Sequence, residues 1–208
     1  MNIKNITDRY HRVFLLILSF AIFPFSVQAT DMQVEQCLLD VKTKYFTKAL
    51  ESCKIAAETG DAGSQLEYGS LYYLGYTGIP VDYDKTLKWI SKSAAQGDPA
   101  AEHTMGELYD FGFGVEKNQQ TAFAWYKKAA AGGVIGSQIN LGLMYFDGIG
   151  TAKNKILGYT WVKVAAHRAG DMAYDILAEM QSDLSTDEIA TANAKADKII
   201  KRVFPAPE

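Results

Sequence analysis

Hydrophobic and small residues recur through the middle of the chain with a period of about 36 positions. Trp89, Trp125 and Trp161 are each 36 residues apart. Glycines and tyrosines keep this spacing to within one residue, at Gly69, Gly106, Gly142, Tyr72, Tyr109 and Tyr145. Within each copy, apolar residues fall on one face at helical spacing on either side of a glycine-rich turn. The pattern therefore predicts three consecutive helix–turn–helix units.

Capping residues and glycines indicate where these helices begin and end. In the second copy, the first helix is expected over residues 100–109 and stops at Gly112, because glycine adopts the left-handed conformation without strain. Seven residues before each tryptophan lies a short polar residue that can cap the second helix: Asp82, Asn118 and Asn154. Gly106 lies within the first helix, where glycine costs about 1 kcal/mol relative to alanine. Its recurrence in every copy predicts that the second helix approaches closely at this point.

The second copy carries the most complete set of recurring residues. They are Gly106, Tyr109, Gly112, Gly114, Val115, Ala122, Trp125, Tyr126, Lys128, Ala129, Ala130 and Gly133. This set resembles the Sel1-like repeat, a relative of the tetratricopeptide repeat. The first copy departs from the family pattern at Tyr68 and Ile90, and the third at Thr151, Gly158 and Val162. The resemblance implies an all-α protein, a right-handed α-solenoid of helix–turn–helix Sel1-like repeats. Repeats in a solenoid stack on their neighbours, so the periodic tryptophans are expected to pack between repeats.

The resemblance also predicts the boundaries of the repeats and of the two caps. The repeats are expected at about residues 60–96, 97–132 and 133–170, with a degenerate helical repeat as an N-terminal cap over 30–59 and capping helices with a tail over 171–208. Ser185 and Glu188 have the spacing of a capping box at the start of the last helix.

The first 29 residues have the pattern of a secretory signal peptide. Three basic residues precede the apolar run 13–23, and Val27-Gln28-Ala29 places small residues at a cleavage site after Ala29. An uncleaved anchor is the alternative, although the run is shorter than the roughly 20 apolar residues that span a bilayer. The pattern predicts a periplasmic or secreted protein with no transmembrane segment after cleavage.

Charge argues against nucleic-acid binding, and the two cysteines indicate a disulfide. Lys and Arg number 21 against 24 for Asp and Glu, a formal net charge of −3. A mildly acidic chain is a poor candidate for binding nucleic acid, whose phosphates require a basic face. Cys37 and Cys53 fall on neighbouring predicted helices, and a cysteine pair in an oxidising compartment usually forms a disulfide. Two buried free thiols are the alternative.

Residues that could support catalysis or bind a metal are sparse. The exported part of the chain has two histidines, His103 and His167, 64 residues apart and without the close spacing of metal ligands. Gly112-Phe113-Gly114 follows no strand and belongs to the repeat's own turn rather than to a dinucleotide site. We therefore expect no enzyme activity, no cofactor and no metal.

The first helix of each repeat is predicted to supply a binding surface. Residues at i, i+4 and i+7 share one face of a helix. In the three copies the face turned away from the second helix is formed by Leu66, Ser70, Tyr73, His103, Glu107, Asp110, Ile139, Leu143 and Phe146. We expect this face to line the concave side of the solenoid and to bind a protein or peptide.

The resemblance favours an adaptor function, because Sel1-like repeat proteins commonly act as adaptors, including in bacterial envelope assemblies. Two alternatives remain open at this stage. Some cysteine-rich members of the family are linked to penicillin binding and β-lactam hydrolysis, although the three best copies here lack cysteine. The aromatic side chains could instead bind the glycan of peptidoglycan.

Overall fold

The computed structural model describes residues 25–204, and side chains from residue 31 onward. Over this range the chain forms ten α-helices and no β-strand. They are α2 (Phe25–Lys42), α3 (Phe46–Glu58), α4 (Ala62–Leu74), α5 (Tyr83–Ala95), α6 (Pro99–Phe111), α7 (Gln119–Ala131), α8 (Ile135–Asp147), α9 (Lys155–Ala169), α10 (Asp171–Gln181) and α11 (Thr186–Val203). The predicted signal peptide lies outside the described residues except for 25–29, which begin α2.

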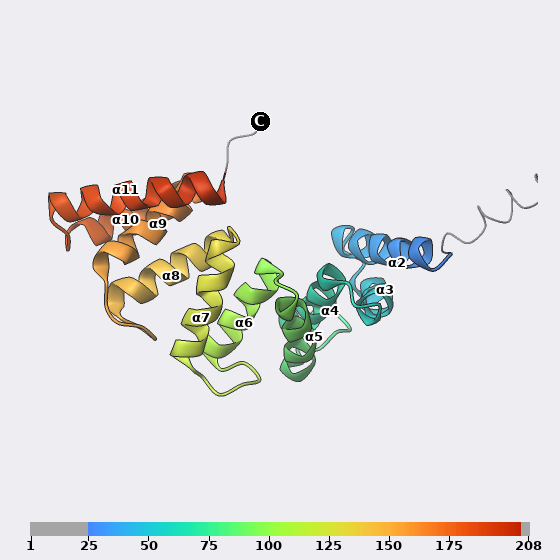
Figure 1. Cartoon of the computed structure of the whole chain (residues 1–208). Coiled ribbons are helices and arrows are strands. Elements are labelled where there is room, and N and C mark those ends of the chain that lie inside the picture. Colours follow the sequence, from blue (N-terminus) through green and yellow to red (C-terminus); the bar gives the residue numbers. More distant parts are fainter. Residues whose placement is uncertain (1–24, 205–208) are drawn as a thin grey trace, which may run out of the picture.

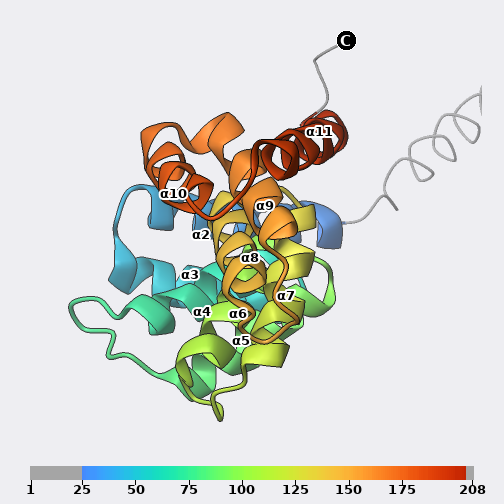
Figure 2. The same cartoon turned by 90° about the vertical axis from the view of Figure 1, so that its left-hand side faces the viewer.

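The helices form an α-solenoid, as predicted. Three central hairpins, α4 with α5, α6 with α7 and α8 with α9, follow one another along an arc, with α2 and α3 at one end and α10 and α11 at the other (Figure 1). Figure 2 views the stack from its C-terminal end. We call α4, α6 and α8 the A helices and α5, α7 and α9 the B helices. No helix within residues 25–204 is long and apolar enough to cross a membrane.

The predicted caps set the boundaries of the B helices. The side-chain oxygens of Asp82, Asn118 and Asn154 each accept a hydrogen bond from a backbone N–H in the first turn, at 2.9–3.0 Å. At the other side of the turn, Gly112 and Gly148 end α6 and α8 in the left-handed conformation, each with φ of 78°. These positions confirm the capping prediction and fix where each A helix turns back into its B helix.

Recurring glycines bring the two helices of a repeat into contact. A Cβ atom added at Gly69 would lie 2.8 Å from the side chain of Ile90, and one at Gly142 would lie 2.6 Å from Val162. At Gly106 the added atom would lie 2.6 Å from the ring of Tyr126. The prediction of a close helix–helix approach is therefore confirmed in all three repeats.

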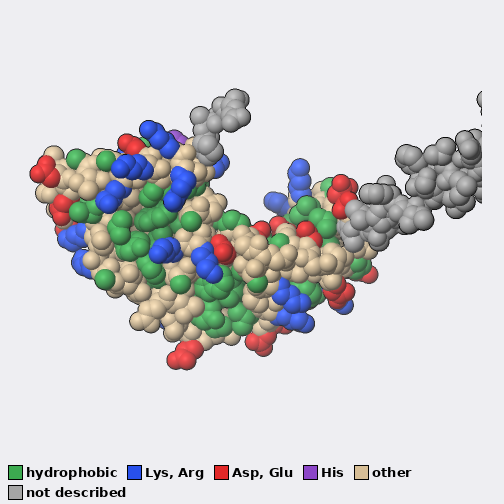
Figure 3. Space-filling view, in the orientation of Figure 1, with side chains coloured by type: hydrophobic (Ala, Val, Ile, Leu, Met, Phe, Trp, Pro, Cys, Tyr) green, Lys and Arg blue, Asp and Glu red, His purple; other side chains and the backbone are tan. Residues whose placement is uncertain are grey.

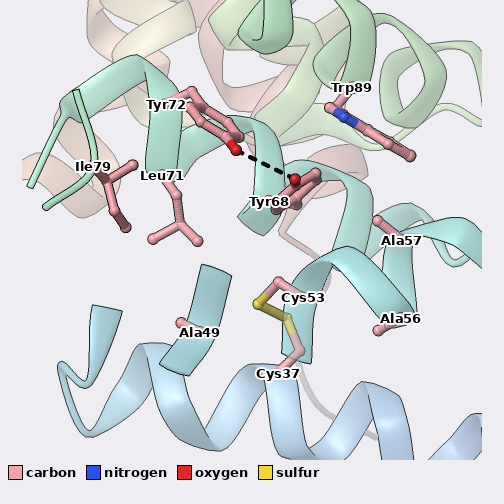
Figure 4. Packing of buried hydrophobic residues seen from close by; sticks show 10 residues of the cluster. All are labelled: Cys37, Ala49, Cys53, Ala56, Ala57, Tyr68, Leu71, Tyr72, Ile79 and Trp89. Atoms are coloured by element: carbon pink, nitrogen blue, oxygen red, sulfur yellow. Dashed lines mark hydrogen bonds between the residues drawn. A yellow bond between two sulfur atoms is a disulfide. The ribbon is translucent and has the colours of Figure 1, made fainter. Parts of the chain in front are cut away.

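Trp89 and Trp125 pack between repeats, as their period predicts. Trp89 is buried in a cluster with Tyr68, and the same cluster includes Ala56 and Ala57 from α3 (Figure 4). Trp125, on α7, packs against a cluster that includes Ile90 of the preceding B helix. These two rings therefore join their own repeat to the helices before it.

The two ends of the solenoid are closed differently. At the N-terminal end, a disulfide joins Cys37 of α2 to Cys53 of α3 inside the same buried cluster, with a Cα–Cα distance of 4.5 Å (Figure 4). The predicted bridge is therefore present. At the C-terminal end, α10 and α11 both pack mainly on α9, and Ser185 with Glu188 forms the predicted capping box.

Candidate functional site

The structure places all nine predicted binding residues on the A helices, and each is half-buried. Leu66, Ser70 and Tyr73 lie on α4, His103, Glu107 and Asp110 on α6, and Ile139, Leu143 and Phe146 on α8. We call the surface formed by these nine residues the A-helix face. Partial exposure leaves each side chain able to contact a partner while it also packs within the protein.

Polar contacts connect this face from one repeat to the next. The hydroxyl of Tyr73 on α4 donates a hydrogen bond to Glu107 on α6 at 3.2 Å. Nε2 of His103 lies 3.6 Å from the Glu107 carboxylate, and Nδ1 lies 2.8 Å from Oγ of Ser137 on α8. A chain of side chains therefore links three successive A helices and sets their relative positions.

Asp110 connects the A-helix face to the neighbouring B helix. Its carboxylate accepts hydrogen bonds from Nε2 of Gln119 at 2.9 Å and from the hydroxyl of Tyr126 at 3.4 Å. Burial raises the pKa of the Tyr126 hydroxyl, and the nearby charges of Asp110 and Glu107 raise it further. Tyr126 therefore stays protonated and acts as a permanent hydrogen-bond donor to this carboxylate.

The apolar members of the face also contribute to the core. Tyr73 packs against a cluster that contains Ile90 and Met105, and its ring lies 6.4 Å from that of Phe113. Phe146 packs against the cluster of Tyr159 and Val162 on α9, so this residue lies against its own B helix and the prediction that it is turned away from that helix is wrong. Exposed parts of these rings remain available for contact, but truncating them would also remove core packing.

Two tyrosines of the first repeat have no equivalent in the other copies, and both make contacts within the chain. Tyr73 bonds to Glu107, as described above. Tyr76, in the turn after α4, stacks on Phe46 of α3 with ring centroids 3.7 Å apart. The longer first turn therefore serves to attach the first repeat to the N-terminal cap.

The order Ser137–His103–Glu107 is that of a nucleophile, a base and an acid, but its geometry does not serve hydrolysis. Ser137 is fully buried, with 0% of its surface exposed, so Oγ cannot reach a substrate carbonyl. Within residues 31–204 no three His, Cys, Asp or Glu side chains gather closely enough to hold a metal ion. The face offers hydrogen-bonding groups, charged side chains and apolar surface.

Sequence reasoning missed two carboxylates beside this face, Glu67 on α4 and Glu102 on α6. Both are half-buried. Burial raises the pKa of both carboxylates, and the charge of Asp98, at the start of α6, raises each further. They occupy different positions in their repeats, so the 36-residue period does not point to them. A comparison of charge between A and B helices could have found them, because the A helices carry no Lys or Arg.

His103 is expected to make stability depend on pH. Burial lowers its pKa below the ordinary value of 6.5, and the charge of Glu107 offsets only part of this effect. The unfolded chain therefore binds more protons as the pH falls below 6.5, and the contribution of His103 to the free energy of unfolding falls with it. An NMR titration should give a midpoint below 6.5 for the His103 ring.

The matched variant is His103→Gln, which does not titrate. The wild type should lose stability relative to this variant as the pH is lowered from about 8 to about 5. A midpoint above the ordinary value, or a stability difference that does not change with pH, would contradict the assignment of His103 as a buried neutral base.

The geometry of stacked helix hairpins with a continuous half-buried face defines an α-solenoid of the repeat-scaffold class. The Sel1 repeat family model matches residues 62–98, 99–134 and 135–169, slightly more than half of the chain. The chain therefore belongs to the Sel1 repeat family. Sel1 repeat proteins are generally protein–protein interaction modules, and the fold is typically a non-catalytic scaffold.

Similar proteins come from distant sources. A Sel1 repeat protein from Oxalobacter formigenes has a crystal structure with a TM-score of 0.57 and 33% identity, covering 62% of this chain and 97% of that one. A protective antigen of uropathogenic Escherichia coli with an SLR fold has a TM-score of 0.57 and 23% identity, covering 76% of this chain and 42% of that one. The second likeness shows the fold alone.

Among curated proteins, the ERAD-associated E3 ubiquitin-protein ligase component HRD3B of Arabidopsis thaliana is 25% identical over 129 residues. A putative sel1-like repeat-containing protein of Acanthamoeba polyphaga mimivirus is 30% identical over 95 residues. The matched segments span 20% and 14% of these two proteins. The shared part is therefore the repeat scaffold and not a whole protein.

Proposed function

We propose that this chain is an exported, non-catalytic adaptor of the bacterial cell envelope, which binds a protein or peptide segment along the A-helix face. The observation that carries the proposal is the continuity of this face. Half-buried side chains from three successive A helices are aligned by the Tyr73–Glu107 and His103–Ser137 contacts. A rigid surface that extends over several repeats suits an extended ligand, because little ordering is needed on the protein side.

Export is supported by two independent features. The first is the signal-peptide pattern of residues 1–29. The second is the disulfide between Cys37 and Cys53, since such bonds persist in oxidising compartments such as the periplasm. Binding is favoured over hydrolysis because the hydroxyl next to His103 belongs to a fully buried serine.

A pair of identical substitutions on the two helix layers tests the binding surface. Ser70 is half-buried on α4 and its side chain takes part in no hydrogen bond that the structure shows, so Ser70→Tyr should place a bulky ring on the A-helix face. Ser91 is half-buried on α5, and Ser91→Tyr places the same ring on a B helix. We expect crosslinking in the native envelope fraction to capture a partner with the wild type and with Ser91→Tyr, and at least about tenfold less with Ser70→Tyr.

The controls separate binding from folding and from export. Both variants should have melting temperatures close to each other, and mass spectrometry of the exported protein should give a chain that begins at Thr30. Capture that survives Ser70→Tyr but is lost with Ser91→Tyr would move the binding surface to the B helices. A chain that keeps residues 1–29 and stays in the cytoplasm would overturn the envelope role.

A further inference from the structure

Charged side chains are divided sharply between the two helix layers of the solenoid. The A helices α4, α6 and α8 carry no Lys or Arg, and neither does α10 at the end of the stack. Cationic side chains of the repeats are instead concentrated on the B helices, at Lys85, Lys88, Lys92, Lys127, Lys128, Lys155, Lys163 and Arg168. One layer of the molecule is therefore acidic and the other basic.

The B-helix cations contact aromatic rings of both layers. Lys85 lies 4.5 Å from the ring of Tyr72 on α4, and Lys155 lies 5.6 Å from that of Phe146 on α8. Lys92 lies over the ring of Trp89 at 4.2 Å, and Lys128 lies over Trp125 at the same distance. In the part of the chain with described side chains, the two lysine–carboxylate pairs join Lys85 to Asp82 and Lys155 to Asp183, and neither involves the A-helix face. Within residues 31–204 no carboxylate of the A helices forms an ion pair with a lysine or arginine, although Lys128 lies near enough to Glu102 to lower its pKa.

Five acids lie beside or within the A-helix face, on α4, on α6 and directly before α6. They are Glu67, Asp98, Glu102, Glu107 and Asp110. Burial and the charge of Asp98 raise the pKa of both Glu67 and Glu102, and Lys128 offsets this only in part for Glu102. Half-buried carboxylates of like charge cost stability unless a cation compensates them. The arrangement is one in which a cation from outside the chain would relieve the repulsion.

We propose that the partner is a basic segment, in which Lys or Arg side chains alternate with apolar ones, bound in extended form along the A-helix face. This inference rests on the proposed function. The carboxylates supply charge complementarity to the cations, and the partly exposed rings of Tyr73 and Phe146 supply apolar contact. Figure 3 shows Asp and Glu side chains along the floor of the hollow between the two ends of the arc. The same charges repel phosphate groups, so nucleic acid and anionic lipid are disfavoured on this layer.

The test of this proposal uses carboxylates that make no hydrogen bond or ion pair within residues 31–204. Within the described residues, neither Glu67 nor Glu102 makes a side-chain hydrogen bond or lies within ion-pair distance of a Lys or Arg. The double variant Glu67→Gln/Glu102→Gln removes two charges while keeping side-chain size. The matched control is Glu51→Gln/Glu116→Gln, which makes the same charge change at exposed positions on α3 and in the turn before α7.

Stability and binding should change in opposite directions. Peptides selected by phage display from a random library against the full exported chain should be enriched in Lys and Arg together with apolar residues. Their dissociation constants should rise about tenfold for Glu67→Gln/Glu102→Gln and change little for the control. The melting temperature of the first variant should stay the same or rise, because a like-charge repulsion is removed.

The possible outcomes distinguish failure of the basic-partner proposal from failure of the proposed function. Selected peptides that are neutral or acidic, but lose binding with Ser70→Tyr, would overturn the basic partner and leave the proposed function intact. Selected peptides that no A-helix substitution affects, or a failure to select any peptide, would count against both. Basic peptides that bind the wild type and both double variants equally would show binding through net charge alone, which also overturns the inference.

Discussion

Replacing Gly106 with leucine should lower the melting temperature by about 10 °C, the largest effect we expect from a single substitution. A Cβ atom at this position would lie 2.6 Å from Cδ1 and Cε1 of Tyr126, which is far closer than carbon atoms approach. Tyr126 is fully buried, so its ring cannot swing aside without displacing its neighbours. Overpacking of this kind costs about 3 kcal/mol or more when two helices must separate. Thermal unfolding followed by circular dichroism measures the effect.

The control for this prediction is Lys117→Leu, a change to the same residue in the exposed turn between α6 and α7. It should leave the melting temperature within about 2 °C of the wild type, as surface substitutions usually do. The variant Gly106→Ala separates the effect of helix propensity from that of the contact with Tyr126. Helix propensity alone would make alanine about 1 kcal/mol more stable than glycine, whereas the contact with Tyr126 makes it less stable. A stabilising Gly106→Ala would show that the two helices do not touch at this point.

Removing the disulfide should have the second largest effect. Cys37 and Cys53 enclose a short loop, and in the chain-entropy model such a cross-link contributes about 3 kcal/mol. Both cysteines are fully buried between α2 and α3, so their loss also loosens the packing of the terminal helix. We expect Cys37→Ala/Cys53→Ala to unfold at lower temperature and to exchange the amide hydrogens of α2 faster than those of α6.

Thiol counting and reduction complete this test. Unreduced wild-type protein should expose no reactive thiol in denaturant. A reducing agent should destabilise the wild type but leave the double alanine variant unchanged, since that variant has no bond to reduce. Two reactive thiols in the unreduced protein would contradict the bridge.

Most members of the A-helix face could be assigned to one side of their helices from the sequence, but the contacts among them could not. Helical spacing put Leu66, Ser70 and Tyr73 on one face of α4 because the geometry of an α-helix is fixed. The bond from Tyr73 to Glu107 joins residues 34 apart on different repeats. Such a contact depends on the rotation between neighbouring repeats, which the period of a sequence pattern does not specify.

The absence of Lys and Arg from α4, α6 and α8 can be read from the sequence, but the positions of their acidic side chains relative to one another cannot. Glu67 and Glu102 occupy different repeat positions, so they share no periodic signal. Glu102 lies one helical turn after Asp98 on α6, whereas only the packing of neighbouring repeats brings Glu67 near the same charge. Burial raises the pKa of both carboxylates, and the charge of Asp98 raises each further. The raised pKa of each carboxylate thus depends on burial and on distances that only the folded chain defines.

The sequence by itself determined the repeat architecture, the caps and the helix contacts at Gly69, Gly106 and Gly142. It could do so because each repeat packs mainly on its immediate neighbours, and three copies present the same local requirement three times. Only the tertiary structure decided that Cys37 and Cys53 are bridged, that Ser137 is buried beside His103, and that Tyr76 stacks on Phe46. These outcomes depend on burial and on distances between helices, which arise when the repeats assemble and which no single segment encodes.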